Sequence, residues 1–264
     1  MRFVRSLFKL VWVVILLLSA VVDWWVRRPR VGAAGAVWIH GWCRLLVRVM
    51  RIEVKVVGNL PTDGAVVSNH LSYLDILLYS AVRPFVMVAK SEVRGWPLLG
   101  WLTSRAGTVY VTRGGGPSTY PGVNAAMAEA YGSGLPVLFF PEGTTTDGSG
   151  VLRFRRGLFH SVLNEEVPLR VAALRYSLED AGGSVEEDVC WCGDALLAPH
   201  LWRLLGLKTI RAEICFGGEV RERWDRFVLS EESREQVIEM SENQKTLGVL
   251  FPEVAADSVF SELL

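Results

Sequence analysis

Residues 65–75 read AVVSNHLSYLD and join a short apolar run to the start of an apolar helical segment. The run from Ala65 to Val67 is typical of a buried strand, and the pattern from Leu74 onward is typical of a helix. A buried strand that leads directly into a helix is the repeating unit of α/β domains. The segment therefore predicts a chain that folds around a sheet whose strands alternate with helices.

The same alternation extends along most of the chain. Strands are expected at Glu53–Val57, Ala65–Ser68, Phe85–Ala89, Thr108–Val111, Val137–Phe140, Arg170–Tyr176 and Arg211–Phe216. Helices are expected at Ser72–Ser80, Glu92–Ala106, Gly122–Tyr131, Leu158–Asn164, Ala195–Leu205 and Glu231–Asn243. The predicted fold is a mixed, mostly parallel sheet flanked by helices. We expect membrane-associated helices at 1–52, the α/β domain at 53–228 and a C-terminal helical tail at 229–264.

Charge is strongly segregated in a chain whose formal net charge is zero. Residues 1–55 carry ten basic and two acidic groups, a balance of +8, so the remainder carries −8. Five of the ten tryptophans lie in the first 42 residues, which is typical of side chains at the headgroup level of a bilayer. The basic, tryptophan-rich segment 1–55 favours an anionic membrane surface as the partner over nucleic acid. Binding of nucleic acid would need basic residues on the folded domain. Tryptophans in a soluble core are the alternative.

The N-terminal segment has the pattern of a helical hairpin. An uncharged run of 13 residues at 10–22 is shorter than the roughly 20 that a spanning helix needs. Basic residues lie on both sides, and the residues after Asp23 are not a signal-peptide cleavage site. After Pro29, a second amphipathic helix is expected over 36–50. We expect the two helices to lie in one leaflet, with a single span as the alternative.

A histidine and an aspartate follow the strand in residues 65–75. His70 comes just after the strand, and Asp75 lies five positions later on the first turn of the next helix. An aspartate bonded to one imidazole nitrogen fixes the tautomer and leaves the other nitrogen free to accept a proton. The pair is therefore a candidate general base for a hydroxyl group. A histidine that only caps a turn is the alternative.

Residues 107–113, GTVYVTR, form a second strand that ends in a functional side chain. Arg113 is followed by three glycines, which would let backbone N–H groups approach a phosphate that the guanidinium binds. An arginine on a solvated loop is the alternative interpretation.

Residues 139–146, FFPEGTTT, form a third strand end with an acid and several hydroxyl groups. Glu142 could hold Arg113 or polar groups of a substrate, and the N–H groups of Gly143 and Thr144 could bind an anion. Arg155 and Arg156 add two cations downstream. The glycine and lysine pattern of a nucleotide-binding P-loop is absent.

In this order and spacing, the three motifs resemble those of the glycerolipid acyltransferase family. The matching residues are Asn69, His70, Asp75, Gly107, Tyr110, Val111, Arg113 and Phe140 to Thr144. The resemblance covers about residues 53–180. A fourth motif keeps only one of two prolines, at Pro168, and the basic or serine residue that usually follows the third motif is replaced by TTDG at 145–148.

The resemblance implies acyl transfer from acyl-CoA or acyl carrier protein to the free hydroxyl of lysophosphatidic acid, giving phosphatidic acid. It implies catalytic roles for His70 and Asp75. The implied substrate-binding residues are Asn69, Gly107, Arg113, Glu142, Gly143 and Thr144, with Arg155 and Arg156 as outer candidates. No metal or organic cofactor is expected, and the expected partners are the bilayer, the lysophospholipid and the donor, without nucleic acid.

The four cysteines bear on where the protein is located. Four cysteines are too few for a disulfide framework, and reduced cysteines favour a cytosolic location. We therefore expect the protein at the cytoplasmic face of the inner membrane.

The alternative functions are acylation of another lysolipid, such as lyso-ornithine lipid or lysophosphatidylcholine, and a non-catalytic membrane-binding role. A hydrolase is disfavoured because no serine has the Gly-x-Ser-x-Gly context.

Overall fold

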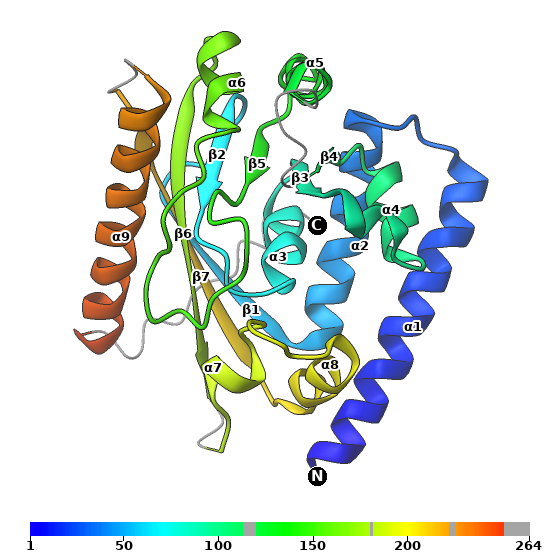
Figure 1. Ribbon diagram of the computed structural model, residues 1–264. Helices are drawn as coiled ribbons and strands as arrows, with labels where there is room; N and C mark the ends of the chain where they lie inside the picture. Colours follow the sequence, from blue (N-terminus) through cyan, green and yellow to red (C-terminus); the bar gives the residue numbers. More distant parts are fainter. Residues whose placement is uncertain (113–119, 180–181, 222–224, 251–264) are drawn as a thin grey trace.

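The protein is built on one seven-stranded sheet with the order β1-β7-β6-β2-β5-β3-β4 (Figure 1). The computed structural model describes residues 1–112, 120–179, 182–221 and 225–250. The strands are β1 Ile52–Val57, β2 Ala65–Ser68, β3 Val86–Lys90, β4 Val109–Val111, β5 Val137–Phe139, β6 Leu169–Leu178 and β7 Ile210–Glu219. Neighbouring strands pair in parallel except β6 with β7. The predicted mixed, mostly parallel sheet is confirmed.

Helices cover both faces of this sheet (Figure 1). They are α1 Arg2–Arg27, α2 Ala33–Met50, α3 Leu74–Val82, η1 Ser91–Gly95, α4 Leu99–Arg105, α5 Tyr120–Tyr131, α6 Phe159–Asn164, α7 Val185–Asp188, α8 Leu197–Gly206 and α9 Arg226–Leu250. One core cluster packs α1, α2, α3 and α8 on one face, and the other packs α5, α6 and α9 on the opposite face. Within β2, Val66 joins the first cluster and Ala65 and Val67 the second. This alternation explains why the whole strand is apolar.

Two helix predictions need correction. The helix predicted over Glu92–Ala106 is divided into η1 and α4 because Pro97 has no N–H group to donate and disfavours a helical residue before it. Leu98 between them has a positive φ of 60°. The single-turn helix α7 was not predicted, because four residues are too few to show a period.

The predicted hairpin of α1 and α2 is present, and α1 is longer than its uncharged run. Among the described residues, α1 is the one helix that is long and apolar enough to cross a membrane. Its first turns are nevertheless bound to the body of the protein. The buried ammonium of Lys9 donates to the carbonyls of Met50 and Leu207, both at 2.7 Å. Arg5 and Ser6 donate to carbonyls of α8.

The tryptophans of the hairpin divide into two groups. Trp24 and Trp38 are buried and pack edge to face, with ring centroids 5.0 Å apart. These two rings pack against protein, and the headgroup-level position expected for them stays a prediction. Trp12 and Trp25 are exposed, as the expectation requires.

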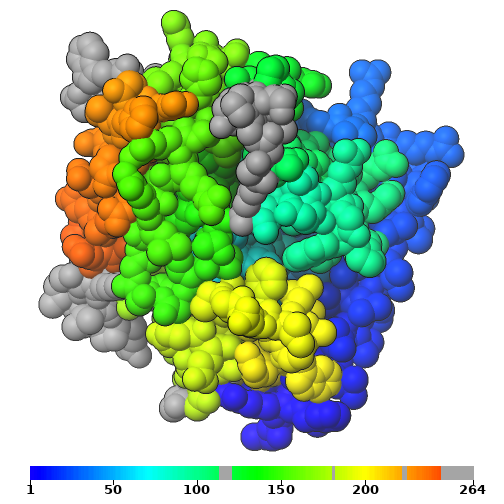
Figure 2. All heavy atoms as spheres, viewed as in Figure 1, coloured from blue at the N-terminus to red at the C-terminus, as the bar shows by residue number. Residues whose placement is uncertain are grey.

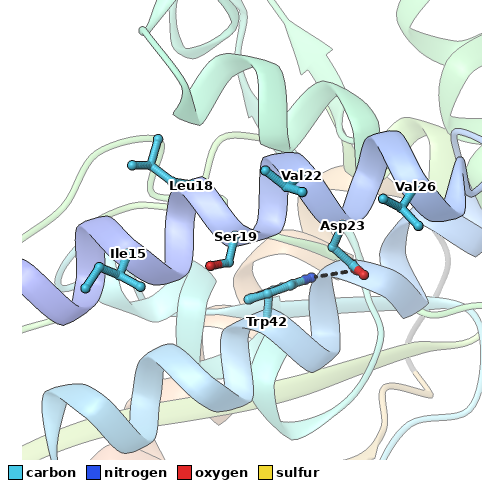
Figure 3. A pocket seen from close by; sticks show the side chains of 7 residues that line it. All are labelled: Ile15, Leu18, Ser19, Val22, Asp23, Val26 and Trp42. Atoms are coloured by element: carbon cyan, nitrogen blue, oxygen red, sulfur yellow. Dashed lines mark hydrogen bonds between the residues drawn. The ribbon is translucent and has the colours of Figure 1, made fainter.

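A groove of about 490 Å³ lies between α1 and α2 (Figure 3). Its lining residues are Ile15, Leu18, Ser19, Val22, Asp23, Val26 and Trp42. The Asp23 carboxylate accepts the indole N–H groups of Trp38 at 2.9 Å and Trp42 at 3.3 Å. These bonds link the two helices at the end of the hairpin farthest from Lys9.

Candidate active site

His70, in the loop between β2 and α3, meets Asp75 on the first turn of α3. The Nδ1 atom of His70 lies 2.7 Å from Oδ2 of Asp75. The same oxygen accepts the backbone N–H groups of Leu71 at 2.6 Å and Ser72 at 3.0 Å. Because the strand ends at Ser68 and α3 begins at Leu74, the aspartate turns back toward the histidine, and the predicted contact is confirmed.

The imidazole of His70 is held in a fixed plane. Its ring stacks on Phe140, with centroids 4.0 Å apart and planes 9° apart. An ionised Asp75 accepts the proton on Nδ1, which makes Nε2 the ring nitrogen available for a substrate proton. Asp75 is completely buried, whereas the His70 side chain is 16% exposed. One member of the pair is therefore shielded and the other is accessible.

Glu142 connects this loop to the loop after β5. Its Oε1 accepts the backbone N–H of His70 at 2.7 Å, and its Oε2 accepts that of Leu152 at 2.8 Å. The side chain is only 3% exposed, and burial raises the pKa of Glu142, while these two N–H groups and the nearby His70 lower it. Both oxygens are engaged by backbone. Arg113, the partner predicted for Glu142, lies outside the described residues.

Gly143 and Arg155 are in contact. Gly143 has a positive φ of 72°, and a methyl group at this position would lie 2.6 Å from Nε of Arg155. Only glycine fits this backbone and lets the guanidinium approach so closely. Thr144 is exposed beside them. Arg156 turns elsewhere, since its guanidinium lies 4.4 Å from the ring centroid of Phe227 at the start of α9.

Two residues predicted to bind substrate have contacts within the fold. The amide of Asn69 is buried and bonds both the N–H and the carbonyl of Leu174 on β6, at 2.8 and 2.9 Å. Gly107 packs against the turn of the hairpin, where a methyl group would lie 2.5 Å from Cα of Gly32. A substrate contact for either residue stays a prediction.

The segment after α7 also contributes to the site and was not predicted. Trp191 donates its backbone N–H to Leu71 at 2.8 Å, and its carbonyl accepts the hydroxyl of Thr145. Its ring lies 6.3 Å from that of Trp96. Figure 2 shows the segment after β5 (green), α4 with η1 (teal) and the α7–α8 region (yellow) meeting on one face. Sequence offered no signal for this, because the contacts join residues far apart in the chain.

Tyr176 on β6 is the second unpredicted residue. Its hydroxyl donates to Oδ1 of Asp75 at 2.6 Å, and the side chain is 4% exposed. The sequence places Tyr176 at the end of a predicted strand, and only the strand order shows that this position meets Asp75. Among the described residues, no group of three or more acids, histidines and cysteines is placed to hold a metal ion.

Comparison with known proteins shows which family this chain resembles. The family model described as Acyltransferase matches residues 51–173. The chain is 34% identical over 179 residues to 1-acyl-sn-glycerol-3-phosphate acyltransferase of Neisseria meningitidis, covering 67% of this chain and 69% of that protein. The chain belongs to the glycerolipid acyltransferase family. The resemblance seen in the three motifs is thereby confirmed.

Two further comparisons describe the breadth of the acyltransferase family around this chain. Lyso-ornithine lipid O-acyltransferase of Pseudomonas aeruginosa is 38% identical over 165 residues, an alignment that spans 62% of each protein. The crystal structure of the 1-acyl-sn-glycerophosphate acyltransferase of Thermotoga maritima superposes with a TM-score of 0.64 at 15% identity, covering 93% of this chain and 98% of that one. The likeness in fold therefore extends well beyond the residues that the family model matches.

Proposed function

We propose that the protein transfers a fatty acyl group from a thioester, acyl-CoA or acyl carrier protein, to the free hydroxyl of lysophosphatidic acid, forming phosphatidic acid. The observation that carries the proposal is the 2.7 Å contact between His70 and buried Asp75, which leaves Nε2 as the available base. Family membership supports acyl transfer, and the relative in Neisseria meningitidis supports this acceptor.

The proposed reaction moves one proton in each direction. Nε2 of His70 takes the proton of the lipid hydroxyl as its oxygen attacks the thioester carbonyl, and Asp75 stabilises the imidazolium that forms. The tetrahedral intermediate then loses the thiolate as the carbon–sulfur bond breaks. The proton on Nε2 passes to the departing sulfur, so the base is regenerated without a covalent acyl-enzyme.

Glu142 acts in this proposal through the backbone. By accepting the N–H of His70, it holds the base at the end of β2. Arg155 beside Gly143 is the described cation best placed for the phosphate of the acceptor, since a guanidinium can bind two phosphate oxygens at once. The role proposed for Arg113 in the same site rests on its motif.

Lyso-ornithine lipid is the second candidate acceptor. Thr145, Thr146 and Asp147 replace the basic or serine residue that usually follows the third motif. The 38% identity to the lyso-ornithine lipid O-acyltransferase of Pseudomonas aeruginosa, and the 33% identity to that of Brucella abortus, favour this acceptor. In this case the same His70 chemistry would act on a different headgroup.

We propose that α1 and α2 lie in the cytoplasmic leaflet of the inner membrane. Large apolar side chains of α1 are exposed, among them Phe8, Trp12, Ile15 and Leu18, which suits lipid contact. Lys9 binds the carbonyls of Met50, at the end of α2, and of Leu207, just after α8, so α1 cannot leave the domain without exposing these groups. A lysolipid in the same leaflet would present its hydroxyl at the height of the site.

A product assay tests the function. Purified protein in vesicles receives labelled acyl-CoA, or acyl carrier protein that bears a labelled acyl group. The acceptor is lysophosphatidic acid, lyso-ornithine lipid or lysophosphatidylcholine. The His70→Ala variant is assayed in parallel. Label in phosphatidic acid that disappears in the variant supports the first proposal, and label only in ornithine lipid supports the second. Free fatty acid as the product, or no product with any pair, contradicts both.

A labelling experiment tests the placement in the membrane. Single cysteines are introduced by Arg2→Cys and Arg30→Cys, at the two ends of α1, in a variant whose four native cysteines are serine. If α1 lies in the cytoplasmic leaflet, an impermeant maleimide labels both positions in inverted vesicles and neither in intact spheroplasts. Labelling of one position from each side contradicts the proposal.

A further inference from the structure

The segment that carries His70 and Asp75, residues 69–75, is called the catalytic loop below. Tyr176 reaches this loop because β6 is longer than its neighbour β2. The two strands pair in parallel, with Ser68 at the end of β2 opposite Ala172. β6 continues to Leu178, so Tyr176 lies four residues beyond this level, about 13 Å along the strand. Its side chain is thereby placed beside the loop that carries His70 and Asp75.

The hydroxyl of Tyr176 has a distinct place around Asp75. Oδ2 of Asp75 accepts three bonds, from His70 and from two backbone N–H groups. Oδ1 accepts the hydroxyl of Tyr176 at 2.6 Å, its one hydrogen bond among the described residues. A completely buried carboxylate depends on such donors for its charge to be stable. Tyr176 therefore fixes the second oxygen, and with it the plane, of the carboxylate.

We propose that Tyr176 is a positioning residue for the catalytic pair, whose hydroxyl orients Asp75 and thereby sets how tightly His70 binds a proton. This inference rests on the proposed general-base function. Tyr176 lies beyond residues 51–173, which the family model matches, and outside the three motifs. It acts through Asp75.

The hydroxyl of Tyr176 stays protonated at every pH at which the reaction would run. Burial, together with the neighbouring Asp75, raises the pKa of Tyr176 well above its ordinary value of 10. The other titratable groups that face Asp75 come from several elements: His70, Glu142, Tyr79 and Cys190. The pKa values of Tyr79 and Cys190 are also raised by burial, to about 12 for Cys190, so neither carries charge near neutral pH.

Removal of the Tyr176 hydroxyl should raise the proton affinity of the His70–Asp75 pair. In Tyr176→Phe, Oδ1 loses its donor, the negative charge of Asp75 is less stabilised, and the pair binds its proton more tightly. We expect the pKa of His70 to rise by about one unit. On the acid side of the profile, kcat/KM then falls about tenfold, because one unit is a factor of ten in the unprotonated fraction. Both KM values should stay within about twofold, since the hydroxyl is buried and bonded to Asp75.

The matched control is Tyr131→Phe. It removes the hydroxyl of a partly buried tyrosine, which bonds Ser161 at 3.2 Å on the opposite face of the sheet. Loss of general packing or stability would affect both variants, whereas only Tyr176→Phe should shift the proton equilibrium of His70.

The experiment has one arm that needs no substrate. His70 is titrated by NMR in full-length protein carrying ¹⁵N-histidine in micelles, with the signal assigned from His70→Ala, and pH profiles of kcat/KM are recorded in parallel. A shift to higher pH in Tyr176→Phe alone supports the proposal. Coinciding titrations of wild type and Tyr176→Phe overturn it, even if no acceptor has yet been found. Absence of acyl transfer by wild type contradicts the proposed function and leaves the titration decisive.

A second variant covers the case in which Tyr176→Phe does not fold. Fluorotyrosine inserted at position 176 keeps the ring and the hydroxyl but makes the phenol a stronger donor. The pKa of His70 should then fall, opposite in sign to the change in Tyr176→Phe. An unchanged pKa in this variant overturns the proposal.

Discussion

The catalytic loop and helix α1 both remove charged side chains from water, but they satisfy them differently. Asp75 accepts the N–H groups of Leu71 and Ser72, which lie four and three residues away in its own loop. Lys9 donates to the carbonyls of Met50 and Leu207, which lie 41 and 198 residues away. Three of the four hydrogen-bond partners of Asp75 thus come from its own segment and the fourth is Tyr176, whereas both partners of Lys9 come from distant segments.

This difference separates two kinds of mutational effect. A change at the accessible side of the catalytic loop should alter rate without loosening the fold, because the bonds that shape the loop remain. A change at the contacts of α1 should loosen the fold without altering the chemistry. The predictions below test this separation.

His70→Ala should give the largest effect. Loss of a general base typically lowers the rate by about 10²- to 10⁴-fold, and Asp75 keeps its backbone donors in the variant. We expect kcat to fall by that factor while the melting temperature changes little. Kinetics with labelled acyl donor and thermal unfolding in the same detergent measure the two quantities. His160→Ala, at an exposed position on α6, is the control.

Either of two results would break the comparison. A melting temperature that falls by many degrees in His70→Ala would show that the imidazole itself supports the fold. Retained activity would remove His70 from the mechanism.

Glu142→Gln should give an intermediate loss of rate. Both carboxylate oxygens accept backbone N–H groups, so the amide nitrogen of glutamine must face a donor. Such a mismatch costs roughly 1–3 kcal/mol, which displaces His70 and lowers kcat roughly tenfold to a hundredfold. Glu165→Gln on the surface is the control. Equal kcat in both variants would contradict the bracing role of Glu142.

The same variant has a predicted pH dependence of stability. Burial raises the pKa of Glu142 above the ordinary 4.5, so the folded state binds this proton more tightly than the unfolded state. Its contribution to the free energy of unfolding therefore declines as the pH rises from about 4.5 through the raised pKa, and is constant above it. Glutamine does not titrate. The stability difference between wild type and Glu142→Gln should decline over this window in denaturant unfolding at several pH values.

Lys9→Met should affect stability and leave the chemistry intact. Methionine fills the space of the stem but leaves the carbonyls of Met50 and Leu207 without their donor. We expect the free energy of unfolding to fall by roughly 1–3 kcal/mol, with kcat per folded molecule unchanged. Chemical denaturation in detergent and kinetics on the same sample measure both. Lys90→Met at a surface site is the control. A loss of kcat without a loss of stability in Lys9→Met would reverse the comparison.

The contrast also explains how much the sequence could predict. The sheet, the helices that cover it and the His70–Asp75 contact were foreseeable, because each depends on a period or a spacing within a few residues. The positions of Trp24 and Trp38 were not, since their burial depends on packing against each other across the hairpin and against Trp101. Asn69 shows both what the sequence can predict and what it cannot. Its motif was recognisable, but its bonds to Leu174 depend on the strand order.

Ser72→Ala should give the smallest effect and decides between two chemical routes. Ser72 lies between His70 and Asp75, and its buried hydroxyl has no hydrogen-bond partner among the described residues. A buried hydroxyl without a partner does not stabilise the fold, so its removal should leave the free energy of unfolding unchanged or slightly raised. Because His70 would act directly on the lipid hydroxyl, kcat should stay within about twofold of wild type. A loss comparable to that of His70→Ala, with acyl-enzyme trapped by acid quench in wild type alone, would instead establish Ser72 as a nucleophile and replace the direct transfer.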